Sequence, residues 1–250
     1  MAPLTALIGG TGLSSPEHFK RIETLAIDTP FGPPSAPLLR GEFHGHDILF
    51  LARHGNPHVL PPHKVNYRAN LWAIHSLGVK YVLAVAAVGG ITPKMGPAVI
   101  AIPDQIIDYS YGRATTFFED NLESVTHIDF TEPYSPRLRQ SLIQAAQRAN
   151  LSFVEGGVYG CTQGPRLETP AEILRMERDG CDLVGMTGMP EACLARELGL
   201  EYASISVVAN WAAGKQQGEI TMSEIMANLG LGMKRVATLI DHWKIPEGAG

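Results

Sequence analysis

The sequence predicts an α/β fold, because short apolar runs alternate with segments in which apolar residues recur at helical spacing. Several apolar runs end on glycine, threonine, arginine, histidine or asparagine, as strands of an α/β sheet do at a ligand-binding edge. With 250 residues, 45% of them hydrophobic, the chain is long enough to bury a substantial core. We expect one domain over residues 1–250, with a flexible tail over about 244–250.

The N-terminal half contains three predicted strands and one helix. The strands cover residues 4–8, 47–52 and 81–87. A glycine-rich turn follows the first strand, and the second ends on a basic pair. Before the third strand, Leu71, Ile74 and Leu77 have helical spacing, and Gly78 ends that helix.

The C-terminal half continues this alternation. We expect strands over residues 99–103 and 202–209, and a third that begins at Asp182. Helices are expected over about 136–149, from 171, from Pro190, where a first-turn proline is tolerated, and over about 225–240. The polar loop from 108 to 136 is long for a compact domain, and loops of this length are usually functional.

Composition and charge argue against several classes of protein. The net charge is −5 and the basic residues are scattered, which disfavours a nucleic-acid or anionic-membrane partner. No apolar run reaches the roughly 18 residues of a membrane span, and Met1–Leu4 lack the basic start of a signal peptide. The three cysteines form no close metal-binding pair. We therefore expect a cytoplasmic protein with no metal site.

Polar residues at predicted strand ends are candidate ligand-binding groups. The turn at residues 9–12 could point backbone N–H groups at an anion, with a hydroxyl from Thr11, and a simple tight turn is the equal alternative. It lacks the third glycine of the dinucleotide fingerprint and the lysine of the phosphate loop. Arg53 offers a charged donor fork that suits phosphate, and His54 can donate or exchange a proton; the alternative is a solvated pair.

Two further residues could bind a planar heterocycle. Glu168 could accept two N–H bonds, or be an ordinary first-turn acid of the next helix. Asn210 could offer an acceptor and a donor, or merely cap a turn. Methionines could line an apolar pocket, although methionine at such spacings more often fills a core: Met186, Met189, Met222 and Met226.

Five segments in order resemble the trimeric purine nucleoside phosphorylase and methylthioadenosine phosphorylase family. They are residues 8–13, 53–55, 62–70, 164–169 and 185–191, and the match covers nearly the whole chain. The resemblance implies a homotrimer whose mixed, partly barrel-like sheet is flanked by helices. It also implies reversible phosphorolysis, in which inorganic phosphate, as co-substrate and without a cofactor, displaces a purine from a nucleoside. No covalent nucleophile is needed, and no convincing Ser-His-Asp or Cys-His set is present.

The resemblance also assigns site residues. Positions that match the family's phosphate site are Thr11, Arg53, His54, the backbone at Ala87, and Thr187. Those expected at the purine are Leu167, Glu168, Asn210 and Ala212. Met186 matches a sugar-contacting methionine, and His127 falls in a loop that crosses to a neighbouring subunit in this family. Arg53, His54 and Asn210 are expected to act in catalysis.

Departures from the family's patterns indicate the base. Adenine-specific members carry two aspartates where this sequence has Asn210 and Ala212, whereas members that act on 6-oxopurines use a glutamate and an asparagine, as at Glu168 and Asn210. An adenine would turn a lone pair toward Glu168, at a cost of order 1–3 kcal/mol. A hypoxanthine-type base is therefore expected.

The sugar end is inferred from the final helix. Ordinary purine nucleoside phosphorylases of the family place a histidine there, whereas Met222 and Met226, with Ile220, would form an apolar wall suited to a methylthio group. We therefore expect phosphorolysis of S-methyl-5'-thioinosine to hypoxanthine and 5-methylthioribose 1-phosphate. Alternatives are a general inosine/guanosine phosphorylase, a methylthioadenosine phosphorylase and, from another class, a non-catalytic nucleoside- or dinucleotide-binding protein.

Overall fold

The computed structural model describes residues 4–13, 19–120 and 122–246, and all strands of this part belong to one mixed sheet. The strands are β1 (Leu4–Gly9), β2 (Lys20–Leu25), β3 (Leu38–Phe43), β4 (His46–Ala52), β5 (Val79–Gly90), β6 (Ile100–Ile102), β7 (Gln105–Asp108), β8 (Phe153–Glu155), β9 (Val158–Cys161), β10 (Leu183–Gly185) and β11 (Glu201–Trp211). Their hydrogen-bonded order is β2-β3-β4-β1-β5-β10-β9-β7, while β11 pairs with β5 and β6, and β8 with β6.

The sheet divides along one edge of β5. On that edge the first half of the strand pairs in parallel with β1, up to Ala84, and its end pairs antiparallel with β10, at Gly89 and Gly90. On the opposite edge β11 pairs in parallel along almost the whole strand. Within the described strands, residues 85–88 therefore have no sheet partner on the divided edge. This gap lies at the carboxyl end of β1, where α/β proteins bind ligands.

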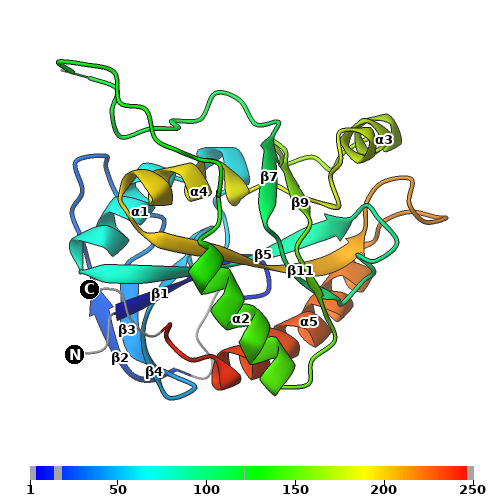
Figure 1. Ribbon diagram of the computed structural model, residues 1–250, viewed down its shortest axis with the longest axis horizontal. Helices are drawn as coiled ribbons and strands as arrows, with labels where there is room; N and C mark the ends of the chain where they lie inside the picture. The colour runs from blue at the N-terminus through cyan, green and yellow to red at the C-terminus, as the bar shows by residue number, and fades with distance from the viewer. Residues whose placement is uncertain (1–3, 14–18, 121, 247–250) are drawn as a thin grey trace.

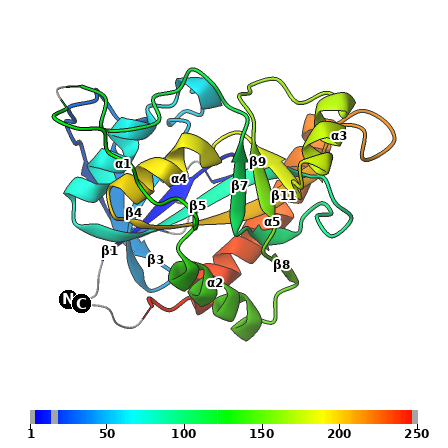
Figure 2. The same ribbon diagram turned by 45° about the horizontal axis from the view of Figure 1, so that its top comes forward.

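Helices cover both faces of the sheet (Figures 1 and 2). They are α1 (Tyr67–Ser76), α2 (Pro136–Arg148), α3 (Pro170–Arg178), α4 (Gly188–Glu197) and α5 (Met222–His242). Alternate residues of β5 point to opposite faces. Val82 and Ala84 belong to the core beneath α1 and α4, and Leu83 and Val85 to the core beneath α2 and α5. Two apolar layers thus hold the dividing sheet from both sides.

The start of α3 is fixed by a capping box. The Thr169 side chain accepts from the Glu172 N–H, and the Glu172 carboxylate accepts from the Thr169 N–H at 2.7 Å. The first-turn acid of α3 is thus Glu172. Glu168 lies before the cap, in the preceding loop, so its alternative role as a first-turn acid is excluded.

The α/β class and most expected elements are confirmed, and the differences concern strands. The expectation from sequence lacks β2, β3, β7, β8 and β9. Charged residues interrupt β2 and β3, and β7, β8 and β9 are only three or four residues long, so none of the five has a long continuous apolar run. The long loop after β7 holds no helix or strand up to α2 within its described residues. Of the predicted tail, 247–250 lie outside the described residues. Among the described helices, none has the combination of length and hydropathy that crossing a bilayer takes.

Candidate active site

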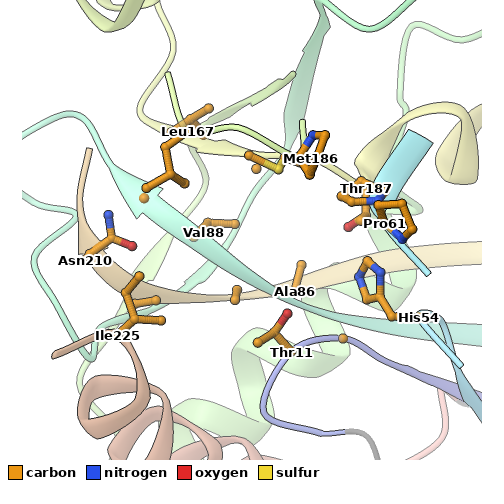
Figure 3. A pocket seen from close by; sticks show the side chains of 18 of the residues that line it. Thr11, His54, Pro61, Ala86, Val88, Leu167, Met186, Thr187, Asn210 and Ile225 are labelled. Carbon is orange, nitrogen blue, oxygen red and sulfur yellow. The ribbon is translucent and has the colours of Figure 1, made fainter. Parts of the chain in front are cut away.

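A cavity of about 380 Å³ opens where the sheet divides. Predicted site residues that line it are Thr11, Arg53, His54, Ala87, Leu167, Glu168, Met186, Thr187, Asn210 and Ala212. Figure 3 shows His54 and Thr187 toward one end and Asn210 and Ile225 toward the other. The volume suits a nucleoside-sized ligand. Residues from β5, β10, β11, the turn after β1 and the loops between strands and helices are thereby brought together, as the strand-end pattern indicates.

The glycine turn after β1 allows a close approach of backbone to the cavity wall. A Cβ on Gly10 would stand 2.8 Å from the Val85 carbonyl oxygen and 2.9 Å from Arg53 Nη1. The turn is closed by the Leu13 N–H, which donates to the Gly10 carbonyl at 3.0 Å. Thr11 is thus presented to the cavity beside β5, with its hydroxyl and the turn's N–H groups available to an anion.

The backbone of Ala87 faces the same space. Peptide groups two residues apart on a strand point to the same edge. The Val85 carbonyl points to the divided edge, where it accepts from Arg53 Nη1 at 2.9 Å. The Ala87 N–H therefore points to that edge too, where the described strands provide no partner. It is a donor available to a ligand, as the motif comparison implies.

Arg53 corrects one expectation from sequence. Its donor fork, expected to face phosphate, faces Glu191: Nε donates to Oε2 at 2.7 Å and Nη2 to Oε1 at 2.8 Å. Arg53 is 1% exposed and Glu191 0%, and Tyr202 donates a further bond to Glu191 at 2.8 Å. Burial alone would lower the pKa of Arg53, and the Glu191 carboxylate outweighs it and raises that pKa. These bonds and that from Nη1 to the Val85 carbonyl use three of the five guanidinium N–H groups, which leaves one on Nη1 and one on Nη2 for an anion in the cavity.

Glu191 is a site-forming residue that the sequence reasoning missed. It lies in the first turn of α4, within the motif over 185–191, but its position alone does not reveal its partner. The available signal is that a buried arginine at the end of an apolar strand needs a buried acid.

His54 is held as a neutral imidazole. Its Nδ1 lies 2.8 Å from the Leu60 carbonyl oxygen, so Nδ1 carries the proton and donates. Burial, then the positive charge of Arg53, lowers its pKa to about 4. The ring also stacks on His58 at 4.6 Å between centroids. Nε2 is consequently an acceptor, suited to a protonated phosphate oxygen or a sugar hydroxyl rather than to a bare anion.

Thr187 lies at the start of α4 and lines the cavity. Its side chain makes no capping bond to the helix. The backbone is not helical at Met189 (φ −118°, ψ 138°), so the regular part of α4 begins at Pro190, where the sequence predicts it. The Thr187 hydroxyl is therefore not used by the helix, and together with Thr11 and the Ala87 N–H it makes this end of the cavity suited to an anion.

The opposite end carries groups for a planar base. Glu168 accepts the Thr162 hydroxyl at Oε1, 2.6 Å away, which leaves Oε2 for a ligand. Asn210 Nδ2 donates to the Trp211 carbonyl at 2.7 Å, leaving its second N–H and its Oδ1. Ala212 is buried and bonds through its N–H to the Gly90 carbonyl, so it contributes an apolar surface. One acceptor and one amide thus line the same end.

The expected methionine wall is not part of this cavity. The described residues that line it include Ile220 and Ile225, but not Met222 or Met226, which are 65% and 52% exposed. The reason is the rotation of α5: Ile225 continues the face that carries Leu229 toward β11, and Met226 is turned by about 100° from Ile225. The wall therefore remains apolar but is made of isoleucine. His127 is exposed and also lies away from the cavity lining of this single chain.

Arg113, in the long loop after β7, was also missed. Its Nη2 donates to the Gln163 carbonyl at 2.9 Å and its Nη1 to the Met186 carbonyl at 2.9 Å. These carbonyls belong to the loops that carry Glu168 and Thr187. One guanidinium therefore ties the base end of the cavity to its anion end, and the length of the loop was the available signal. In the described part of the chain, no cluster of three or more His, Cys, Asp or Glu side chains could hold a metal ion.

The fold and cavity define a class: an α/β protein that binds an anion and a planar heterocycle side by side at the divided edge of its sheet. Residues 5–243 match the model of the Phosphorylase superfamily, and the chain belongs to this superfamily. The resemblance seen in the five sequence segments is thereby confirmed.

Relatives and solved structures agree with this assignment. The chain is 56% identical over 235 residues to a probable S-methyl-5'-thioinosine phosphorylase of Pseudomonas syringae pv. tomato, covering 94% of this chain and 96% of that protein. It is 44% identical to a probable 6-oxopurine nucleoside phosphorylase of Thermococcus kodakarensis, covering 90% and 85%. The methylthioadenosine phosphorylase of Schistosoma mansoni in complex with adenine superposes with a TM-score of 0.91 at 32% identity, covering 96% and 90%.

Proposed function

We propose that the protein converts S-methyl-5'-thioinosine and inorganic phosphate to hypoxanthine and 5-methylthioribose 1-phosphate. The observation that carries this proposal is the pairing of Glu168 and Asn210 at one end of a cavity whose other end is built for an anion. The names of the relatives that are more than half identical to this chain support the same substrate. Phosphate is the co-substrate, and we propose that neither a metal nor an organic cofactor takes part.

At the anion end, phosphate is held by Thr11, the Ala87 N–H and Thr187. Arg53 contributes through its remaining N–H groups on Nη1 and Nη2, and its charge is balanced by Glu191. The neutral Nε2 of His54 accepts a hydrogen bond from the O–H of monohydrogen phosphate or from a sugar hydroxyl. The phosphate anion then stabilises the positive charge that develops on the sugar as the bond to the base breaks. Fixed positions of both partners supply much of the rate.

At the base end, Glu168 accepts the N1–H of hypoxanthine through its Oε2. Asn210 donates its remaining N–H to the base, where negative charge develops as the glycosidic bond breaks, and its Oδ1 can accept from a protonated N7. Adenine would meet Glu168 with a lone pair instead of a donor, which disfavours a 6-aminopurine by about 1–3 kcal/mol.

At the sugar end, Ile220 and Ile225 favour a methylthio group over a free hydroxyl, which they would leave without a partner. A general 6-oxopurine nucleoside phosphorylase is the second candidate, because a relative of that name is 44% identical and would share the base end. Of these two candidate functions, the apolar sugar end favours phosphorolysis of the methylthio substrate.

We propose that the working unit is a homotrimer in which the long loop around His127 reaches a neighbouring subunit. Exposed apolar side chains on this loop, Tyr111, Phe118 and Val125, support a contact there. Light scattering of the purified protein would test it, and a monomeric mass would refute it. The cytoplasmic location stays a prediction.

The substrate proposal is tested by steady-state assays, with and without phosphate, of methylthioinosine, inosine, guanosine and methylthioadenosine. We expect phosphate-dependent release of hypoxanthine and the highest kcat/KM for methylthioinosine. Inosine turned over equally well would replace the first candidate by the second. Faster turnover of methylthioadenosine would overturn the base assignment, and no turnover of any nucleoside would overturn phosphorolysis.

A further inference from the structure

Thr162 is fixed in space by its backbone. It directly follows β9, and its N–H donates to the Gly185 carbonyl at the end of β10, 2.8 Å away. Its own carbonyl accepts from Arg113 Nη2 at 3.2 Å. The same guanidinium also bonds the Gln163 and Met186 carbonyls, each at 2.9 Å. Thr162 is therefore held between a strand end and a side chain that ties two loops of the cavity together.

The hydroxyl of Thr162 is aimed at the base end. It donates to Glu168 Oε1 at 2.6 Å, and its alternative acceptor, the Gly185 carbonyl, is more distant at 3.3 Å. A hydrogen bond to an ionised acceptor at this distance belongs to the strong class. Because Thr162 is anchored by its backbone while Glu168 lies in the loop before α3, the hydroxyl orients the carboxylate rather than the reverse.

This orientation bears on base recognition. Glu168 lines the cavity, and with Oε1 occupied by the Thr162 hydroxyl, Oε2 is the oxygen left to accept from a ligand. A 6-oxopurine offers N1–H to that oxygen, whereas a 6-aminopurine offers a lone pair and needs a donor there. A Glu168 freed from Thr162 can turn its carboxyl group, so that its preference for an N1–H donor is weakened.

We infer that Thr162 is a specificity-determining residue, whose fixed hydroxyl holds Glu168 as the acceptor for the N1–H of a 6-oxopurine. The inference rests on the proposed function, because it assigns the base end of the same cavity. It acts through Glu168, so Thr162 is a positioning residue and touches no reacting atom.

The test is Thr162→Val, which keeps the shape of the side chain and removes the hydroxyl. We expect kcat/KM for methylthioinosine to fall at least tenfold and that for methylthioadenosine to change less than threefold, so that the ratio of the two falls at least threefold. Thr162→Ser should restore the ratio. Thr116→Val is a matched control, since the Thr116 hydroxyl donates to Glu197 Oε1 at the same 2.6 Å outside the cavity, and should leave the ratio unchanged.

Binding of the free bases separates this inference from the proposed reaction. Calorimetry of wild type and Thr162→Val with hypoxanthine and with adenine needs no turnover. We expect Thr162→Val to lose hypoxanthine affinity about tenfold while adenine affinity holds or rises. Parallel losses for both substrates and both bases, or a ratio within twofold of wild type, would overturn the inference. A wild type that binds hypoxanthine selectively but releases none from methylthioinosine would overturn the reaction and leave the inference standing.

Discussion

At the scale of single residues, the buried ion pair of Arg53 and Glu191 is the most consequential contact of the site. Both side chains are almost fully removed from solvent, and Tyr202 adds a third hydrogen bond to the carboxylate. Such a pair contributes little net stability compared with apolar residues, but removal of one partner leaves an uncompensated buried charge. The pair therefore fixes the anion end of the cavity.

Glu191→Leu should lower the free energy of unfolding by about 3–5 kcal/mol, because Arg53 is left buried without its counter-charge. The double variant Arg53→Met with Glu191→Leu should recover most of that loss, since no charge remains. Urea denaturation of wild type, both single variants and the double variant forms the cycle. Losses that simply add would contradict the pair as described.

His54 makes stability depend on pH in a predictable direction. Its pKa is about 4 in the folded protein, below the usual value near 6.5. Between these values the unfolded chain binds a proton that the folded chain does not, so stability is complete above pH 6.5 and falls as the pH drops toward 4. Between pH 7 and pH 5, the titration of this imidazole should lower the free energy of unfolding by about 2 kcal/mol.

Urea unfolding of wild type and His54→Asn at pH 7 and pH 5 measures this contribution. The variant should lose about 2 kcal/mol less than wild type over that interval. His75→Asn, at an exposed position in α1, serves as the control and should behave as wild type. Equal losses in wild type and His54→Asn would show that His54 is not held neutral.

The same scale shows what sequence can predict. Thr11, Glu168 and Asn210 were found because each stands at a strand end or in a Gly/Pro-bounded loop before a helix, and these positions follow from local patterns. Glu191 and Arg113 could not be found in this way. Glu191 lies 138 residues from its partner Arg53, and Arg113 lies 73 residues from Met186, whose carbonyl it bonds. Only the packed sheet brings these residues together.

At the scale of elements, α5 shows why the apolar character of the sugar end was predicted correctly but the residues that form it were not. The sequence indicates an apolar helix near the cavity, but which of its residues face inward depends on how the helix is rotated against β11. That rotation is set by close contact at Gly232, where an added Cβ would stand 2.2 Å from Val207 Cγ1. Ile225 consequently faces the cavity, and Met222 and Met226 face solvent.

Gly232→Ala should lower the free energy of unfolding by about 1–3 kcal/mol, because the new methyl group forces α5 away from β11. Gly230→Ala is the matched control in the same helix, since an added Cβ there meets nothing within 4 Å. It should raise stability by about 0.5–1 kcal/mol through helix propensity. Thermal unfolding of both variants checks the pair, and equal shifts would contradict the close contact.

Element types were predicted better than sheet edges. The long apolar runs of β5 and β11 and the periodic helices are strong local signals. β2 and β3 are not, because Lys20, Glu23 and Arg40 interrupt their apolar residues, and the strands form only as an antiparallel pair at the edge of the sheet.

At the scale of the whole molecule, the anion end is assembled from β1, β5 and α4, which lie far apart in the chain. A ligand that binds only this assembled arrangement stabilises the folded state. Phosphate at about 100 times its dissociation constant should therefore add about 2.7 kcal/mol to the free energy of unfolding.

Thr187→Val should reduce this gain, because the hydroxyl at the N-terminus of α4 is removed while the shape of the side chain is kept. Thermal unfolding across a phosphate series, at constant ionic strength, measures it. Thr24→Val, on the exposed face of β2, should retain the full gain. A phosphate-induced shift in Thr187→Val equal to that of wild type would exclude Thr187 from the anion end.

The divided edge of β5 has a consequence for how this protein tolerates mutation. In a continuous sheet, the peptide groups of residues 85–88 on this edge would bond to a neighbouring strand, but here no described strand pairs with them. One of these groups, the Val85 carbonyl, accepts from the Arg53 side chain. The Ala87 amide is supplied by the course of the chain and not by the identity of the residue. Substitutions over residues 85–88 can alter the packing of this stretch. The backbone donor at position 87 is nevertheless retained with any residue except proline, as long as the strands diverge at the same place.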